Sequence, residues 1–307
     1  MNNILWLACG GTISCRQTEK GLSPAADVGQ LRKMLDCINI PPDTEITARV
    51  LMNTDSSDMD VSRLNTLARA VYEGCLQGHT GIVITHGTDT MAYTAAVLSC
   101  TPENLPLPVI ITGSQRPFFE SGSDGAANLS HALKAACDRR FTGVQLLFGD
   151  KIIPGDRAVK LDTRADNAFT SADGYSSIIK GDEFTDVRPA ELNAGECCLH
   201  EISGNVRLIK LSPFTTGDEI LAAVNSGVKG IALEGFGSCG IPGRLLPAVR
   251  EAADRGVTVA FVSQCLYGGT DGGLYEVGVN AGEAGVVFGY GHTASGVLAR
   301  LAVKCGS

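Results

Sequence analysis

The chain has 307 residues, of which 44% are apolar and 19% charged; this is the composition of a globular protein and excludes a disordered one. The net charge of −8 is not offset by any long basic cluster, so we expect no nucleic-acid partner. The longest apolar runs have the length of strands and are too short to span a bilayer, and the N-terminus has no basic region or cleavage site of a secretory signal.

Strand-sized apolar runs alternate with helical patterns along the first half of the chain. The predicted strands cover residues 2–8, 47–52, 82–85, 108–112 and 143–148, and the predicted helices cover residues 60–72, 92–99 and 126–137. In the first helix, apolar residues recur at helical spacing, with Asp60 or Ser62 near its N-cap. Continuous β-branched runs separated by helices indicate an α/β fold with a mainly parallel sheet that is covered on both faces.

The alternation lapses between residues 181 and 204, where prolines, glycines and an asparagine interrupt it, and then resumes. Further strands are predicted at 206–211, 230–234 and 257–262, and further helices at 219–224, 246–253 and 294–303. We therefore predict a larger N-terminal domain at residues 1–185, a connection at 186–204, and a smaller C-terminal α/β domain at 205–307.

The eleven cysteines favour a reducing compartment. Their number is odd, no C-x-x-C pair occurs, and a single histidine, His200, lies beside Cys197 and Cys198. A disulfide framework normally has an even count in a secreted chain, and a structural zinc ion needs four ligands at recognisable spacing. We expect free thiols, no metal ion and a cytoplasmic protein.

Four of the predicted strands run directly into polar segments, at residues 10–12, 53–58, 86–90 and 113–117. In open parallel sheets, ligands bind beyond the carboxyl ends of the strands. The sequence therefore predicts that these segments meet at one edge of one sheet and form the functional site there.

The pair Gly10–Gly11 ends the first strand and precedes a hydroxyl, Thr12. A dinucleotide-binding turn would need three glycines in the G-x-G-x-x-G phase and a helix after them, and neither occurs here. We favour a catalytic turn, because adjacent glycines let backbone N–H groups face an anion or a developing oxyanion.

Thr12 by itself is an ordinary hydroxyl at a strand end, because a threonine becomes a nucleophile only when a base takes its proton. Thr88 and Asp89 offer a second hydroxyl and a carboxylate, although both residue types also cap helices. Lys160 is a candidate base if burial lowers its pKa, although a single lysine is usually a solvated surface residue. The grouping of these residues, rather than any one of them, favours catalysis.

Two motifs, GGTIS and HGTDTMAYTA, resemble those of the bacterial-type L-asparaginase/glutaminase family, and within it the cytoplasmic type I group. The resemblance extends through LMNTDSSDM, ITGSQRP, SDGAANL and GDRAVK, and in the second half through SQC and YEVGVNAGEAGV. It covers nearly the whole chain. The second motif matches at full length and is highly specific.

The resemblance implies that L-asparagine is hydrolysed to L-aspartate and ammonia. Thr12 would attack the side-chain amide and form an acyl-threonine ester, which water then hydrolyses. Thr88, Asp89 and Lys160 match the family's second catalytic cluster, which activates the nucleophile or the water. This chemistry needs no metal or organic cofactor, and family members are usually homodimers or homotetramers.

The resemblance also implies how the substrate is held. Asp55, Ser56 and Ser57 match the loop that binds the α-carboxylate and the α-amine, together with Thr88 and Asp89, whose carboxylate faces the ammonium. Fixing both ends of a zwitterion also fixes its amide relative to the nucleophile.

One position departs from the family pattern. Leu22 stands where many members have a tyrosine beside the nucleophile. Leucine cannot relay a proton, so either Lys160 and Thr88 suffice, or Arg16 or Tyr93 contributes, or activity is low. We favour a loop in which Leu22 seals the pocket.

Three alternatives stay open. A glutaminase-asparaginase of mixed specificity differs only in a substrate longer by one methylene, which a pocket discriminates by about 1–3 kcal/mol. An amidotransferase subunit acting on misacylated tRNA shares the family fold, but the negative net charge argues against it. A non-catalytic binding protein would not require two hydroxyls and a lysine together.

Overall fold

The computed structural model describes residues 1–189 and 195–306 and divides into two compact units, Met1–Leu199 and His200–Ser307. Residues 190–194 of the predicted connection lie outside the described residues. In the described part of the chain, no helix combines the length and the apolar character needed to cross a membrane.

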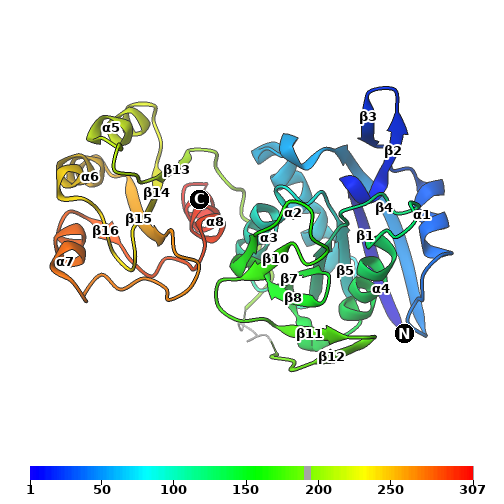
Figure 1. Cartoon of the computed structure of the whole chain (residues 1–307). Coiled ribbons are helices and arrows are strands. Elements are labelled where there is room, and N and C mark those ends of the chain that lie inside the picture. Colours follow the sequence, from blue (N-terminus) through cyan, green and yellow to red (C-terminus); the bar gives the residue numbers. More distant parts are fainter. Residues whose placement is uncertain (190–194, 307) are drawn as a thin grey trace. The chain divides into compact units, whose positions relative to one another are not determined.

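Eight strands of the described residues form the main sheet of the larger unit (Figure 1). In order across the sheet they are β12 (Glu183–Thr185), β11 (Ser177–Lys180), β8 (Lys151–Pro154), β7 (Gly143–Phe148), β6 (Pro108–Thr112), β5 (Gly81–Thr85), β1 (Asn2–Gly10) and β4 (Thr44–Thr54). The strands from β7 to β4 pair in parallel, which confirms the mainly parallel sheet. The antiparallel strands β8, β11 and β12 were not predicted, because each has only three or four residues.

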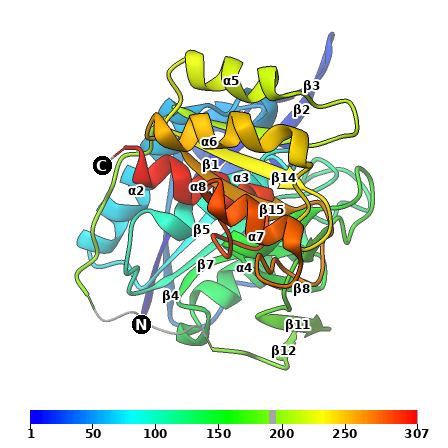
Figure 2. The same cartoon turned by 90° about the vertical axis from the view of Figure 1, so that its left-hand side faces the viewer.

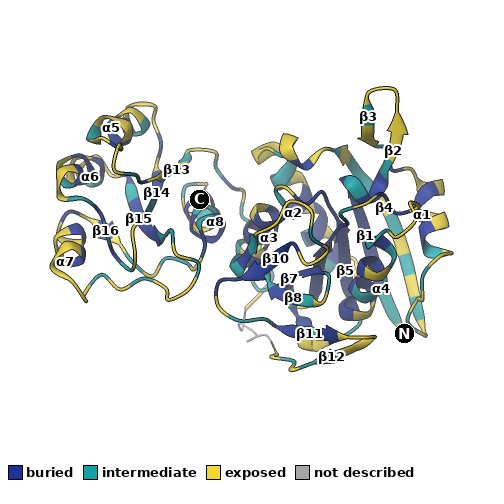
Figure 3. Ribbon diagram, in the orientation of Figure 1, coloured by how far each residue is buried: buried dark blue, intermediate teal, exposed yellow. Residues whose placement is uncertain are grey.

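Helices cover both faces of this sheet, as predicted. They are α1 (Val28–Leu35), α2 (Val61–Leu76), α3 (Met91–Cys100) and α4 (Gly125–Ala136). Strand β1 shows the alternation most clearly: Ile4 and Trp6 pack in one core with α1 and α4, whereas Leu5 and Leu7 pack in another with α2 and α3. Because successive side chains of a strand point to opposite faces, a fully buried strand requires two such cores. Figure 3 shows the central strands as buried.

The larger unit also contains short strands and 3₁₀ turns outside its main sheet. Two small antiparallel pairs are β2 (Cys15–Thr18) with β3 (Gly21–Pro24), and β9 (Ala158–Lys160) with β10 (Phe169–Ser171). Single 3₁₀ turns are η1 (Thr12–Ser14), η2 (Ser56–Asp58), η3 (Arg139–Phe141) and η4 (Gly155–Arg157). Neither small pair, nor helix α1, was predicted from the sequence.

The smaller unit is a second α/β layer structure. Its parallel sheet has the order β13 (Val206–Lys210), β14 (Gly230–Gly235), β15 (Thr258–Ser263) and β16 (Val286–Val287). Helices α5 (Gly217–Asn225), α6 (Leu246–Asp254) and α7 (Glu276–Glu283) share one core with the strands, with the turn η5 (Gly243–Leu245) before α6. Helix α8 (Ala294–Lys304) packs in a separate core. Figures 1 and 2 show α5, α6 and α7 in a row on one side of these strands.

Candidate active site

The four polar segments predicted to converge follow strands that are neighbours in the sheet. These strands lie in the order β6, β5, β1 and β4 and run in parallel, so their carboxyl ends share one edge. Thr12 lies in turn η1 after β1, Asp55 and its neighbours lie at turn η2 after β4, and Thr88 follows β5. The sequence thus predicted the meeting place correctly.

The two glycines before Thr12 allow the turn of Thr12 to pack closely against the turn of Thr88. Gly10 and Gly11 have φ angles of +93° and +75°, a region that side chains with a Cβ avoid. A Cβ on Gly11 would lie 2.2 Å from the backbone nitrogen of Gly87, so the turn of Thr12 packs directly on the backbone beside Thr88. The Gly11 N–H donates to the Thr54 carbonyl at 3.2 Å, so this group does not face an anion as expected. The glycines permit close packing instead.

Lys160 joins this cluster from a distant part of the chain. It is the last residue of β9, and its Nζ donates to Thr88 Oγ1 at 2.8 Å and to Asp89 Oδ1 at 2.7 Å. Only 18% of the Lys160 side chain is exposed, against 63% of the Asp89 side chain. The usual surface-lysine interpretation is therefore wrong here. Thr88, Asp89 and Lys160 form one hydrogen-bonded group with an accessible carboxylate and a sheltered amine.

The turn after β4 presents a carboxylate that stays ionised. Asp55 accepts hydrogen bonds from the hydroxyl of Ser57 and from its backbone N–H, the latter at 2.9 Å. These two donors, the hydroxyl first, hold the pKa of Asp55 below its ordinary value. An exposed anion at this edge is suited to a ligand's ammonium group.

Ser56 is the link between the turns. It is buried, its Oγ accepts from the Asp89 N–H at 3.2 Å, and its carbonyl accepts from Thr90 Oγ1 at 2.7 Å. The hydroxyl proton of Ser56 is not used by the Asp89 contact, so Ser56 can still donate. The structure therefore joins the turn of Asp55 to that of Asp89 through one residue, by its side chain and its backbone carbonyl.

His86 is a residue to which the sequence analysis gave no role. It is fully buried, with Nδ1 2.7 Å from the Gly87 carbonyl and Nε2 3.1 Å from Thr94 Oγ1. A carbonyl only accepts, so Nδ1 carries the proton and Nε2 accepts from Thr94. Burial lowers the pKa of the imidazole and keeps it neutral. The sequence feature that could have pointed to His86 is its position directly after a buried strand, within HGTDT.

The segment with Leu22 forms the β2–β3 hairpin. Leu22 is 48% exposed and pairs with Gln17 across the hairpin, which is largely exposed in Figure 3. Arg16, one of the two residues that could replace the absent tyrosine as a proton relay, forms an ion pair with Asp27 at 2.8 Å. Tyr93, the other candidate, lies on α3 with 41% of its surface exposed.

The described residues contain no group of three or more His, Cys, Asp or Glu side chains that could hold a metal ion.

Two family profiles together span nearly the whole chain. "Asparaginase, N-terminal" matches residues 3–185, and "Glutaminase/Asparaginase C-terminal domain" matches residues 205–306. The chain belongs to the asparaginase family. This asparaginase-family chain is 39% identical to the L-asparaginase of Thermococcus kodakarensis over 304 residues, covering 97% of this chain and 91% of that relative. The solved structure of that thermostable enzyme matches with a TM-score of 0.90 at 37% identity, over 99% of this chain and 93% of the other.

Two other relatives bear on the alternatives. The asparaginase-family chain is 32% identical to L-asparaginase 1 of Escherichia coli strain K12, over 95% of this chain and 88% of the relative. It is also 31% identical to a glutamyl-tRNA(Gln) amidotransferase subunit of Pyrococcus furiosus, over 92% of this chain and 67% of that relative. The resemblance inferred from the motifs is thereby confirmed at the level of the family.

Proposed function

We propose that this protein is an L-asparaginase, a hydrolase of linear amides that converts L-asparagine to L-aspartate and ammonia in asparagine catabolism. The observation that carries the proposal is the close packing of the Thr12 turn on the Thr88 turn, with Lys160 bonded to Thr88 and Asp89. Membership of the asparaginase family and relatives named L-asparaginase support the same substrate.

The proposed mechanism has two steps and needs no cofactor. Thr12 Oγ attacks the amide carbon and gives up its proton, the C–N bond breaks, and the nitrogen leaves as ammonia after taking a proton. Water then attacks the acyl-threonine ester, releases aspartate and restores the Thr12 hydroxyl. Thr88, Asp89 and Lys160 would move the protons, since an amine that is hydrogen-bonded to both a hydroxyl and a carboxylate can pass a proton along.

Asp55, Ser56 and Ser57 would bind the zwitterionic end of asparagine. The lowered pKa of Asp55 keeps its carboxylate charged for the α-amine, and the exposed Asp89 carboxylate is suited to the same ammonium. Ser56 would offer its hydroxyl proton to the α-carboxylate, and Ser57 would hold the Asp55 carboxylate in place, because its own hydroxyl already donates to that carboxylate. Glutamine is longer by a single methylene, so mixed asparaginase-glutaminase activity is the nearest alternative; such a difference is worth about 1–3 kcal/mol.

We further propose the setting in which the enzyme works. The odd number of cysteines and the lack of a C-x-x-C pair in the sequence support a cytoplasmic location. Residues 1–185 would form the catalytic domain, residues 186–204 the connection, and residues 205–307 the smaller domain. The family resemblance supports a homodimer or homotetramer, which light scattering at micromolar concentration would detect.

The decisive experiment is the replacement Thr12→Ala. Ammonia release from L-asparagine should be abolished, while the far-UV spectrum and thermal midpoint stay close to wild type. A slow substrate should add the mass of an acyl group to the wild-type peptide that contains Thr12, and none to the variant. Unchanged turnover in the purified variant would remove Thr12 from the mechanism. Wild-type turnover that required misacylated tRNA would favour the amidotransferase alternative.

A further inference from the structure

The segment after β6, residues 113–118, contacts the turn of Thr12 and the turn of Thr88. We call it the β6 loop. Its Phe118 N–H donates to the Ile13 carbonyl at 3.2 Å, inside turn η1. At its other end, Gly113 lies so close to His86 that a Cβ there would be 2.3 Å from the His86 carbonyl oxygen. The loop therefore touches two of the segments that the proposed reaction needs.

The β6 loop also contacts the loop that follows Lys160. Gln115 Nε2 donates to the Ala165 carbonyl at 2.9 Å. Arg116 lies 3.8 Å from Asp166, but both side chains are about half exposed, and such pairs contribute little. The Gln115 bond is partly buried, so it is the stronger of these two links.

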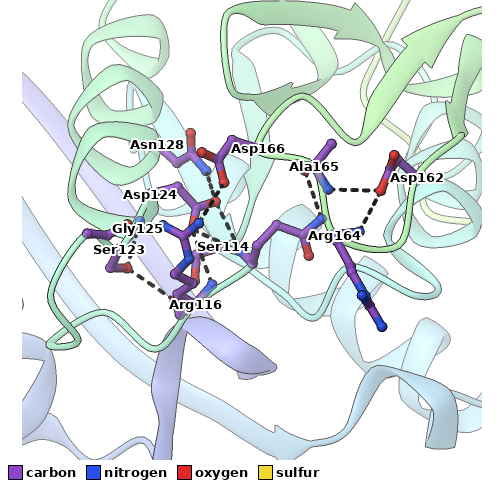
Figure 4. Close-up of polar contacts among 12 residues, drawn as sticks. Ser114, Arg116, Ser123, Asp124, Gly125, Asn128, Asp162, Arg164, Ala165 and Asp166 are labelled. Atoms are coloured by element: carbon purple, nitrogen blue, oxygen red, sulfur yellow. Dashed lines mark hydrogen bonds and ion pairs between the residues drawn. The ribbon is translucent and has the colours of Figure 1, made fainter.

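The loop that receives this bond is itself a compact turn. Asp162 Oδ1 accepts from the backbone N–H groups of Arg164 at 2.7 Å and Ala165 at 2.9 Å, contacts that Figure 4 draws. The Leu161 N–H donates to the Ala168 carbonyl at 2.8 Å and closes the turn. Anchoring Ala165 therefore anchors the whole turn up to Leu161, the residue next to Lys160.

The N-terminal end of α4 supports the β6 loop through hydrogen bonds. The Asp124 carboxylate accepts from the backbone N–H of Gln115 at 2.9 and 3.0 Å, and from that of Arg116 at 3.2 Å. Asp124 is the N-cap residue of α4, yet its side chain makes no capping bond to its own helix. The carboxylate instead accepts charge-assisted hydrogen bonds from the backbone of the β6 loop.

Asn128 completes this support. It is 2% exposed, and its Nδ2 donates to the Gly113 carbonyl at 3.0 Å and to Asp124 Oδ2 at 3.1 Å. Figure 4 shows Asp124 and Asn128 on the same side of the loop that carries Ser114 and Arg116. With the backbone of Gln115 fixed in this way, its partly buried side chain reaches Ala165 from an anchored position.

We propose that Gln115 is a positioning residue of the amide hydrolysis: backed by Asp124 and Asn128, it fixes the Lys160 loop relative to the Thr12 turn. The inference rests on the proposed function. Gln115 acts through Ala165 and the turn next to Lys160, and not on the substrate. Reactions between held groups are sensitive to small displacements, and a misplacement of about 1 Å can cost roughly 100-fold in rate.

The test uses Gln115→Met and Gln115→Glu in the full chain. Methionine keeps the length but cannot donate, so we expect kcat to fall by roughly 10- to 100-fold. KM should stay within about three-fold of wild type, because the substrate turn at Asp55 is not touched. Glutamate places an anion against the Ala165 carbonyl, so its kcat should be lower still. Ser130→Ala is the matched control on α4, since Ser130 Oγ donates to the Asn39 carbonyl, outside the β6 loop.

Amide hydrogen exchange gives a second readout that does not depend on turnover. In Gln115→Met the peptide covering residues 161–168 should exchange faster, whereas the peptides of α4 should be unchanged. If wild-type protein releases no ammonia from asparagine, the proposed function fails while the exchange result still reports on the loop. A kcat within about two-fold of wild type in both variants overturns the inference, even if the thermal midpoint falls, because Gln115 would then be only structural.

Discussion

The replacement Gly11→Ala tests the packing that brings the two catalytic turns together. Gly11 has a φ of +75°, and an added Cβ would lie 2.2 Å from the nitrogen and 2.3 Å from the Cα of Gly87. Both neighbours are backbone atoms, which cannot swing aside as the end of a side chain can. The Thr12 turn and the Thr88 turn would have to separate, by the order of 1 Å, to restore an ordinary contact.

The expected loss of stability has two parts. Gly11 combines its positive φ with a ψ of 176°, a region that is essentially restricted to glycine, and a residue with a Cβ pays about 1–3 kcal/mol to adopt it. Overpacking against a fixed neighbour costs about 1–3 kcal/mol more. The sum of about 2–6 kcal/mol corresponds to a fall in Tm of roughly 4–24 °C for a domain of this size. Because the displaced backbone belongs to the residues directly before Thr12 and Thr88, asparagine hydrolysis should also fall by about 100-fold.

Gly78→Ala is the matched control. Gly78 has a φ of +80°, but an added Cβ would meet nothing within 4 Å. It should therefore lose only the conformational part, about 1–2 kcal/mol, and keep wild-type kcat. Thermal unfolding and steady-state ammonia release measure both variants. The reasoning is refuted if Gly11→Ala is no less stable than Gly78→Ala and turns over asparagine at the wild-type rate.

The remaining predictions concern the amine cluster and the buried imidazole. Thr88→Val and Lys160→Met should each lower kcat/KM strongly. Because the two groups share a hydrogen bond, the double variant should be little worse than the poorer single variant. If the loss in the double variant equals the product of the two single losses, the two groups serve separate steps. Burial lowers the pKa of His86 from 6.5, so the unfolded chain binds its proton first and stability is lost as pH falls below about 6.5. His86→Gln should flatten the fall in Tm below about pH 6.5, and an unchanged slope would assign the effect to other groups.

The part of the fold that could be predicted from sequence is the part with continuous patterns. Strands β1, β5 and β6 are buried on both faces over most of their length, so their apolar runs were unmistakable, and helix α2 carries a clear period of buried residues. Parallel strands that are neighbours have their carboxyl ends at one edge of the sheet. The sequence therefore also predicted that the hydroxyl and carboxylate residues after these strands would lie together. The antiparallel strands at the far edge of the sheet could not be found, because three or four residues give no usable period.

What only the tertiary structure decided is which groups touch. Lys160 lies 72 positions from Thr88, and nothing in its own segment distinguishes it from a surface lysine. Gly11 could equally have freed its N–H for an anion, but the chain uses it to bring its backbone against Gly87. A sequence pattern carries the local period and chemistry of each segment. The contact between two distant side chains depends on strand order, on register and on where each turn can pack, and these are set by the whole sheet at once.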